Sequence, residues 1–499
     1  MGLFGDIIDD ARLIAANIAD YASDVVEPTL RIGVTGLARS GKTVFITALV
    51  NALLHGGRLP LFDAYASGRL ANARLDPQPD DAVPRFAYED HLAALTGGED
   101  RHWPQSTRRV AELRLILHFQ SSRFINRNLS GGQLTLDIVD YPGEWLLDLP
   151  LLQMNYAEWS ARTLAQSRTK VRAPLAAPWH ARLKALDPAA PADETAAREI
   201  AALFTAYLAA AREERHSLSA LPPGRFLMPG DLEGSPALTF APLDIARDAT
   251  APSGSLHAMM ERRYDAYRER IVKPFFRDHF ARLDRQIVLV DVLQALNAGP
   301  AAVADLELAL GDILAAFRPG ANSFLSRILS RRIDRILFAA TKADHIGSSQ
   351  HDRLEAILRR MTRRAIDRAE FAGASVEAAA LAAVRATREG TVTRGGETLP
   401  CVIGVPEKGQ RLGGRALAGN KEIAIFPGDL PEDPESVFPA TEAVESASEV
   451  PESFSEEEAW RFIRFRPPAD LAETPDGGVR LPHIRLDRTI EFLIGDRLI

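Results

Sequence analysis

Apolar positions along this chain follow two spacings, one typical of buried strands and the other of amphipathic helices. Short apolar runs predict core strands at residues 31–35, 112–119, 134–139, 287–293, 336–341 and 381–385. Helical spacing predicts helices at residues 44–54, 192–212, 257–282, 302–317 and 353–368. Because parallel strands need long crossover connections, this alternation predicts an α/β fold with a mostly parallel sheet flanked by helices.

Changes in composition predict how the domains follow one another. We expect an N-terminal amphipathic helix at 1–28, an α/β core at 29–148 and 287–390, a mainly helical insertion at 149–286 and a small C-terminal extension at 391–499. The apolar stripe of the first helix is opposed by an acidic face, which favours packing on the protein's own core over a membrane or partner role.

Two segments have the composition of loops. Residues 56–109 are rich in Pro, Gly and polar residues, and a loop this long inside an α/β domain is functional or disordered. Residues 429–458 contain no Lys or Arg and many Glu, Pro and Ser residues, so we expect an acidic disordered loop. Short β-like runs precede that loop at 401–405 and 423–426.

Overall composition excludes few functions. A chain of 499 residues is expected to form two or three domains. Cys401 is the only cysteine, which fits a reducing compartment. The formal net charge of -8 argues against nucleic acid as the main partner. The sequence shows neither a bilayer-length apolar stretch nor a secretory signal pattern, so we expect a cytoplasmic protein.

The most informative motif is the sequence GLARSGKT at residues 36–43, which matches G-x-x-x-x-G-K-[ST] and is called the phosphate loop below. It lies between a predicted strand and a predicted helix, where backbone N–H groups can surround a polyphosphate. Lys42 would reach the β- and γ-phosphates, and the Thr43 hydroxyl would bind Mg²⁺. A chance glycine-rich turn is the alternative. The predicted contacts are Gly36, Ala38, Arg39, Ser40, Gly41, Lys42, Thr43 and Val44.

A second motif, Asp140-Tyr-Pro-Gly143, directly follows the apolar run at 134–139. An acid at the end of such a strand is placed to hold Mg²⁺, usually through a water molecule. The N–H of Gly143 would approach the γ-phosphate, so that gain or loss of this phosphate moves the segment that follows. The alternative is an ordinary turn at the end of a strand.

A third motif, Thr341-Lys-Ala-Asp344, follows the apolar strand at 336–341 and is called the TKAD box below. It resembles the [NT]-K-x-D box of guanine-nucleotide proteins, in which the carboxylate binds guanine N1–H and N2 and the lysine stem covers the base. Adenine would present an unpaired acceptor to this carboxylate. Thr341, in place of the commoner Asn, can still hydrogen-bond to the phosphate loop. Ala386-Thr387 is the candidate for a further base-binding element.

Three residues are candidates for hydrolysis. Glu144 stands where small GTPases carry a water-orienting glutamine, and its carboxylate would hold water but repel the γ-phosphate. Thr107 is placed to supply a second hydroxyl to Mg²⁺, with a plain loop threonine as the alternative. Arg39 matches an arginine in the phosphate loop of guanylate-binding proteins, which implies an arginine finger in cis; a solvent-exposed or otherwise paired arginine is the alternative.

The chain resembles the YcjX-like family of bacterial stress-associated P-loop GTP-binding proteins. The resemblance is carried by residues 33–43, 103–108, 137–145 and 341–344. It implies a P-loop fold that binds GTP or GDP, a helical insertion, a link to stress and a possible inner-membrane protein partner, and hence a peripheral location at that membrane.

We therefore predict a Mg²⁺-dependent GTP-binding protein that is a slow GTPase and a nucleotide switch. The insertion, entering at residue 149, would carry the change to a partner. One alternative is a non-hydrolysing, nucleotide-gated scaffold in which Glu144 marks lost hydrolysis. A less favoured alternative is an ATPase.

Overall fold

The computed structural model describes most of the chain. The described residues are 28–37, 39–78, 80–106, 109–121, 132–316, 333–371, 373–394, 396–412, 415–439, 460 and 462–499. The predicted N-terminal helix, Ala38 and Thr107 therefore lie outside the described residues.

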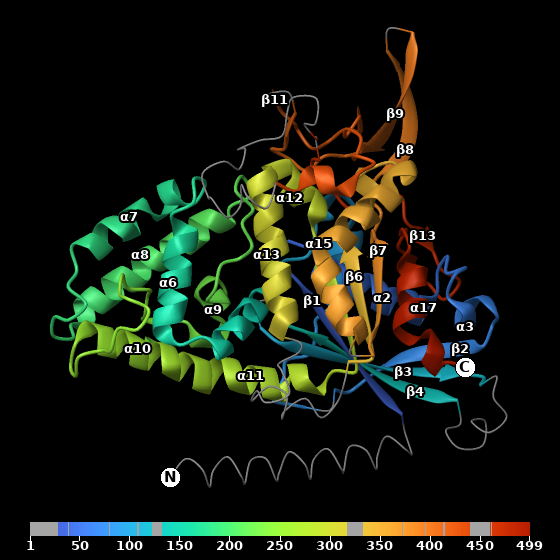
Figure 1. Cartoon of the computed structure of the whole chain (residues 1–499). Helices are drawn as coiled ribbons and strands as arrows, with labels where there is room; N and C mark the ends of the chain where they lie inside the picture. The colour runs from blue at the N-terminus through green and yellow to red at the C-terminus, as the bar shows by residue number, and fades with distance from the viewer. Residues whose placement is uncertain are drawn as a thin grey trace.

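A seven-stranded sheet forms the core (Figure 1). Its spatial order is β2 (Leu70–Asp76), β3 (Ala111–Phe119), β4 (Gln133–Asp140), β1 (Thr29–Gly36), β5 (Arg285–Val290), β6 (Arg335–Ala340) and β7 (Ser375–Ala380). The five strands from β4 to β7 in this order are parallel, whereas β2, β3 and β4 pair antiparallel. The predicted α/β fold with a mostly parallel sheet is confirmed.

Helices cover both faces of this sheet. The helices α2 (Lys42–His55) and α17 (Leu486–Ile494) share one apolar core with the sheet, and α12 (Val292–Ala298), α13 (Pro300–Ala316) and α15 (His351–Phe371) share the other. Along β5 the side chains alternate between these cores, with Ile287 and Leu289 in the first and Val288 and Val290 in the second. The continuous apolar run of β5 thus reflects burial on both faces.

Some predicted boundaries differ from the structure. The last core strand is β7, at Ser375–Ala380, so the prediction of a strand at 381–385 is wrong. Alanines have low strand propensity, but parallel pairing with β6 along the whole of β7 overrides that preference. The strand predicted at 287–293 ends at Val290, because Asp291 accepts a hydrogen bond from Gln294 N (3.1 Å) and caps α12.

The segment at 56–109 is more structured than a loop. It supplies the edge strand β2 and three short helices, α3 (Asp63–Ala66), α4 (Tyr88–Thr96) and η1 (Gly98–Asp100). From Ala71 to Asp76 apolar and polar residues alternate in β2, since only one face of this antiparallel edge strand packs on the core.

The insertion forms a lobe beside the sheet with an aromatic core of its own (Figure 1). Trp159 stacks on Tyr264 at 4.9 Å between ring centroids, and Trp179 stacks on Tyr207 at 5.6 Å. Its elements are η2 (Gly143–Gln153), α6 (Tyr156–Ser167), α7 (Ala173–Lys184), α8 (Glu194–Arg212), α9 (Gly224–Leu227), η3 (Gly230–Leu232), η4 (Pro236–Leu238), α10 (Leu256–Tyr267), η5 (Arg268–Val272), α11 (Lys273–Asp278) and η6 (Phe280–Arg282).

A buried ion pair joins the insertion to the α/β core. Arg172 of the insertion pairs with Asp305 of α13, and it also donates to the Tyr207 hydroxyl at 2.8 Å. Asp305 in turn accepts from the backbone N–H of Ala220 at 2.9 Å. The buried charges are thus paired and hydrogen-bonded, which fixes this contact between the two parts.

The C-terminal extension returns to the core. Its sheet consists of β8 (Arg388–Arg394), β9 (Glu397–Gly404) and β12 (Ile423–Ile425), and the β8–β9 hairpin projects from the body (Figure 1). The first part of the expected disordered loop, residues 429–439, is ordered, because Leu430 and Val437 are buried against the core; residues 440–459 lie outside the described residues. The remaining short elements are η7 (Ala343–His345), η8 (Ser348–Gln350), β10 (Arg411–Leu412), β11 (Arg415–Ala416), η9 (Pro434–Val437), β13 (Ala472–Glu473), β14 (Val479–Arg480) and η10 (Gly495–Arg497).

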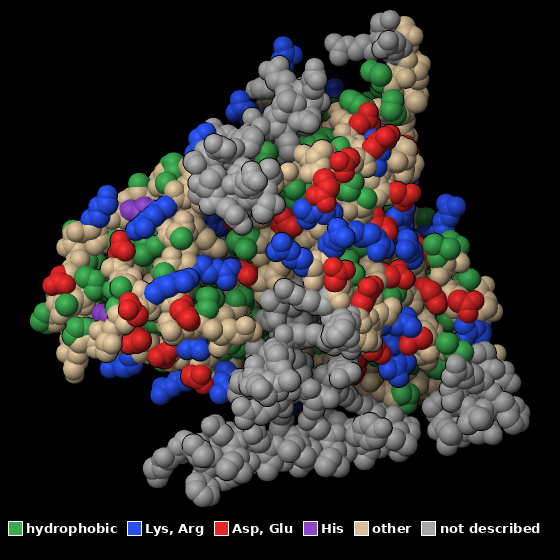
Figure 2. Space-filling view, in the orientation of Figure 1, with side chains coloured by type: hydrophobic (Ala, Val, Ile, Leu, Met, Phe, Trp, Pro, Cys, Tyr) green, Lys and Arg blue, Asp and Glu red, His purple; other side chains and the backbone are tan. Residues whose placement is uncertain are grey.

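The arginine-rich helix α15 carries paired charges. Figure 2 shows blue and red side chains interspersed over this part of the surface. Arg353 pairs with Glu432 at 2.8 Å, and Arg360 pairs with Glu307 at 2.8 Å. These two arginines are therefore neutralised by carboxylates of neighbouring segments. Among the described helices, none is both long enough and apolar enough to cross a bilayer.

Candidate functional site

The phosphate loop joins the end of β1 to the start of α2. Gly41 caps α2 with φ of +80°, in the left-handed region that glycine adopts without strain. Arg39 is also left-handed, with φ of +62°. A Cβ on Gly36 would lie 2.0 Å from Ser40 Oγ, so the loop closes tightly on itself. The N-terminus of a 14-residue helix thus faces the concave side of a glycine-dependent turn.

Asp140 and Gly143 lie directly beside this loop. β4 is parallel to β1, with Asp140 in register with Val34, so the predicted acid ends the neighbouring strand. Lys42 and Asp140 form a buried ion pair, and the Thr43 hydroxyl lies 3.4 Å from the Gln105 carbonyl. A Cβ on Gly143 would lie 1.9 Å from the Gly36 carbonyl oxygen. The turn after β4 and the phosphate loop are therefore in direct contact.

The TKAD box follows β6. Lys342 is left-handed, with φ of +61°, and its ammonium pairs with Asp291 at the end of β5. The Asp344 carboxylate accepts a hydrogen bond from Ala386 N (2.8 Å), and the Thr387 hydroxyl donates to the Asp344 carbonyl. The structure thus brings together Asp344 and residues 386–387, as the sequence predicts.

Electrostatics around the TKAD box are set by burial. Asp344 is 4% exposed, and burial raises the pKa of its carboxyl to about 6. Burial also lowers the pKa of the adjacent His345 to about 3, so this imidazole is neutral at pH 7. The Thr341 hydroxyl lies 3.4 Å from the Val290 carbonyl, and among the described residues no bond to the phosphate loop replaces it. Here the hydroxyl contacts the strand next to its own, and a bond from Thr341 to the phosphate loop stays a prediction.

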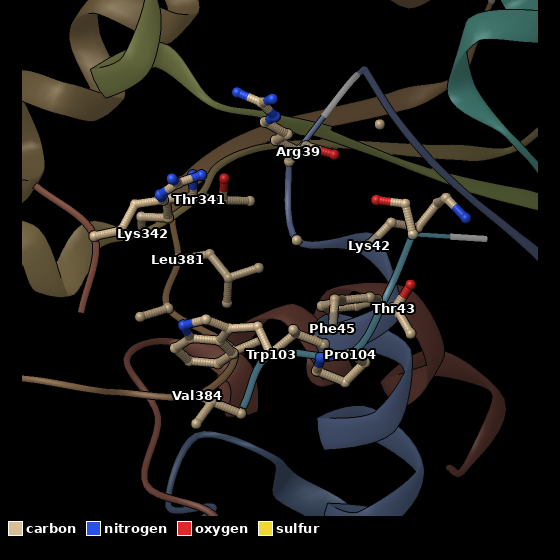
Figure 3. Close-up of a pocket in the computed structure, with 18 of the residues that line it drawn as sticks. Arg39, Lys42, Thr43, Phe45, Trp103, Pro104, Thr341, Lys342, Leu381 and Val384 are labelled. Carbon is tan, nitrogen blue, oxygen red and sulfur yellow. The ribbon is translucent and has the colours of Figure 1, made fainter. Parts of the chain in front are cut away.

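One cavity of about 300 Å³ connects these elements. In Figure 3, Arg39 lies at the top, Lys42 and Thr43 on the right, and Thr341, Lys342 and Leu381 on the left, while Trp103, Pro104 and Val384 form an apolar part below. Three predicted residues do not line the cavity but contact residues that do. Asp140 pairs with Lys42, and Ala386 and Thr387 hydrogen-bond to Asp344. The predicted residues that line the cavity are Gly36, Arg39, Ser40, Gly41, Lys42, Thr43, Val44, Gly143, Glu144, Thr341, Lys342 and Asp344.

The candidate hydrolytic residues are bound to the insertion. Glu144 lines the cavity, is 7% exposed and pairs with Arg212, the last residue of α8. Arg39 also lines the cavity, and its Nη1 lies 3.2 Å from Oε2 of Glu214. Both predicted residues are thus beside the phosphate loop, and each has a partner of opposite charge from the same end of α8.

The segment after Gly143 is bound to the insertion at two further points. The Asp148 carboxylate accepts from Gly224 N at 2.7 Å and from the Tyr267 hydroxyl at 2.6 Å. Burial raises the pKa of Asp148 to about 6. The Arg225 guanidinium lies 3.4 Å from the ring centroid of Trp145, an attractive cation–π geometry. These contacts make η2 part of the insertion's packing.

Several lining residues were missed by sequence reasoning. Five of them lie within the motifs named above but were not singled out, namely Leu37, Trp103, Pro104, Ser106 and Pro142. The others carry no local signal: Phe45, His345, Leu381, Ala382, Ala383, Val384, Glu407, Arg464 and Phe465. Three of these residues come from the C-terminal extension, more than 60 residues after the TKAD box: Glu407, Arg464 and Phe465. Only the fold brings them to the cavity.

Comparisons with known proteins identify the family of this chain. The model of the YcjX-like family, DUF463, matches residues 30–498. A protein of Escherichia coli named Ras-like GTPase YcjX is 40% identical over 483 residues, covering 95% of this chain and 97% of that protein. A protein of the same name from Shewanella oneidensis is 37% identical over 490 residues, covering 94% of each. The chain belongs to the YcjX-like family.

Proposed function

We propose that this protein is a Mg²⁺-dependent GTP-binding switch that hydrolyses GTP slowly. The observation that carries the proposal is that the phosphate loop and Asp344 line one cavity. The relatives' name, Ras-like GTPase YcjX, supports guanine-nucleotide binding and hydrolysis as the activity.

The choice of guanine rests on Asp344. Its orientation is fixed because one carboxylate oxygen accepts from Ala386 N. A pKa of about 6 leaves this carboxyl ionised at pH 7, when it can only accept hydrogen bonds. Guanine offers two donors, N1–H and the N2 amine, whereas adenine presents an acceptor at N1. Adenine would leave the base-facing side of this buried carboxylate without a donor, which is costly.

The donors beside the phosphate loop fit Mg²⁺. Thr43 supplies a hydroxyl and Asp140 a carboxylate, the oxygen ligands that this cation prefers together with phosphates and water. Bound Mg²⁺ would neutralise charge on the phosphates during hydrolysis. Lys42 pairs with Asp140, so phosphate binding requires its ammonium to exchange this carboxylate for phosphate oxygens. Glu144 would hold the attacking water, with its charge offset by Arg212.

The switch is the segment from Gly143 into η2. Gly143 touches the phosphate loop, and Asp148, five residues later, is buried against α9 and α10. A γ-phosphate that moves Gly143 therefore moves a segment that packs within the insertion. A role in a bacterial stress response and an inner-membrane partner are proposed from the family resemblance alone.

The nucleotide retained by purified protein tests this function. We expect GDP or GTP, identified by chromatography of the denatured protein. In Asp344→Asn the side-chain amide gains a donor that matches the 2-oxo group of xanthine, so the preference should change from GDP to XDP. Lys42→Ala is the control for loss of phosphate binding. Tight binding of ATP with weak binding of GTP would overturn the proposal.

A non-hydrolysing scaffold is the second candidate. The Glu144–Arg212 pair favours it, because a carboxylate engaged by arginine is a weaker base for water. Phosphate release from GTP, with Lys42→Ala as the blank, separates the two functions. A wild-type rate above the blank supports the GTPase, and equal rates support the scaffold.

A further inference from the structure

A segment of the C-terminal extension forms one wall of the cavity. Phe465 is bridged to Pro406 after β9, and the backbone of Arg464 accepts from Glu407 N at 2.8 Å. The Trp103 indole N–H donates to the Phe465 carbonyl at 2.6 Å. Phe465 is 2% exposed and its ring contacts His345, the residue directly after the TKAD box, at 5.3 Å between centroids. This wall is therefore fixed against both the base-binding box and the segment before β3.

Two charged side chains of this wall line the cavity. Arg464 Nε lies 3.1 Å from Oε2 of Glu407, and Arg464 Nη2 lies 3.3 Å from Oε2 of Glu214. The Nε atom is buried, and among the described residues its N–H has no aligned hydrogen-bond acceptor. The Glu407–Arg464 pair is thus held together mainly by charge, and its nitrogen and oxygen atoms can still form hydrogen bonds to a ligand.

Their neighbours fix where the pair lies along the cavity. Glu214 also binds Arg39 of the phosphate loop at 3.2 Å, so Arg464 lies close to the outer edge of that loop. Burial raises the pKa of the Glu407 carboxyl, whereas the positive charges of Arg464 and Lys342 lower it. Glu407 is therefore close enough to the TKAD box to interact electrostatically with Lys342. Glu407 and Arg464 therefore lie between the phosphate end and the base end.

In a nucleotide, the part between phosphates and base is the ribose. A carboxylate repels phosphate but accepts hydrogen bonds from sugar hydroxyls, as acidic residues do in dinucleotide-binding folds. We propose that Glu407, held by Arg464, forms a ribose subsite and accepts a hydrogen bond from a ribose hydroxyl of the bound nucleotide. This inference rests on the proposed function, and it makes the C-terminal extension part of the nucleotide site.

The test compares the ribose nucleotide with its deoxy analogues. Calorimetry with GDP, 2′-deoxy-GDP and 3′-deoxy-GDP avoids fluorophores on the ribose. A hydrogen bond to a charged group predicts that wild type binds at least one deoxy analogue about 10- to 100-fold more weakly than GDP. Glu407→Ala should reduce this ratio to about one through loss of GDP affinity, and Glu407→Gln, which keeps an acceptor, should retain part of it.

The control variant is Glu422→Ala, which removes an exposed carboxylate of the same extension that pairs with Arg388. It should keep the wild-type ratio. Equal binding of GDP and both deoxy analogues by wild type would overturn the subsite, and so would an unchanged ratio in both Glu407 variants. Failure of the proposed function is distinguishable, because then no guanine nucleotide binds in any variant.

Discussion

Glu144, one residue after the D-Y-P-G turn, is paired with Arg212 at the end of α8. The pair joins the element that would sense a γ-phosphate to the longest helix of the insertion. It also places a compensating positive charge on a carboxylate that would otherwise repel the γ-phosphate. The two residues therefore connect nucleotide state and insertion by electrostatics as well as by packing.

Removing Arg212 should weaken binding of GTP more than of GDP. In Arg212→Ala the Glu144 charge is left unpaired near the γ-phosphate, and we expect the ratio of GTP to GDP affinity to fall about tenfold. The double variant Arg212→Ala/Glu144→Gln should restore the ratio, since it removes both charges. Calorimetry on the full double-mutant cycle measures this coupling. Equal loss of both affinities in Arg212→Ala would contradict a charge effect.

Asp148 should stabilise the insertion through its hydrogen bonds and not through its charge. Asp148→Ala leaves Gly224 N–H and the Tyr267 hydroxyl without their acceptor, at a cost of about 1–3 kcal/mol for each buried group. Asp148→Asn keeps an acceptor and removes the buried charge. Thermal unfolding of both variants measures the difference.

The same pair of variants predicts a pH dependence. The folded-state pKa of Asp148, about 6, is raised above its ordinary value of 3.8, so the stability gained by protonation is lost as pH rises through 6. The Asn variant does not titrate. Its melting temperature should match wild type below about pH 4, where Asp148 is protonated in both the folded and the unfolded state, and exceed it increasingly as pH rises to 6 and above. A constant difference across this range would show that Asp148 does not titrate near 6.

Guanine binding should weaken in acid. The Asp344 carboxyl, with a pKa of about 6, accepts hydrogen bonds from guanine only when ionised. GDP affinity should therefore be constant from pH 7 to 8 and fall by up to about tenfold per pH unit below 6. The GDP affinity that remains in Asp344→Asn, measured over the same pH range, shows how much of the pH dependence comes from protonation of the phosphates. A wild-type profile parallel to that baseline would exclude Asp344 as the titrating group.

Local motifs predicted the part of the site that lies at strand ends. The phosphate loop, Asp140 and Asp344 each follow a parallel strand, and parallel strands present their carboxyl ends at one edge. The rest of the site and of the sheet depends on contacts between segments that are far apart in the sequence. Glu407 and Arg464 reach the cavity only because the extension folds back on the core, and β7 is a strand because β6 pairs with it. The pairing of Glu144 depends on an arginine 68 residues away.

Gly143→Ala should separate the switch from the phosphate loop. The added Cβ would lie 1.9 Å from the Gly36 carbonyl oxygen, so one backbone must shift. We expect loss of nucleotide binding by at least about tenfold, because the displaced loop no longer directs its N–H groups at phosphate. Gly347→Ala is the matched control, as its nearest contact would be an ordinary 3.8 Å to Ser349 Oγ. Calorimetry with GDP checks both, and unchanged affinity in Gly143→Ala would contradict the contact.

Arg39 tests whether the phosphate loop supplies its own arginine finger. The guanidinium is half exposed and bound to Glu214 at 3.2 Å, so reaching the β–γ bridge requires it to leave this partner. Arg39→Ala should lower GTP turnover by about 10³-fold while GDP affinity stays within about threefold, since a finger acts on charge that develops only in the transition state. Single-turnover phosphate release measures the rate, and calorimetry measures the affinity.

Two further variants separate the finger from the backbone and from the ion pair. Arg39→Gly relieves the left-handed strain at φ of +62° that Ala retains, so equal loss of turnover in both variants assigns the effect to the side chain. Glu214→Gln frees Arg39 from its partner and should raise turnover or leave it unchanged. If Arg39→Ala turns over GTP at the wild-type rate, Arg39 serves to bind Glu214 and the chemistry uses another group.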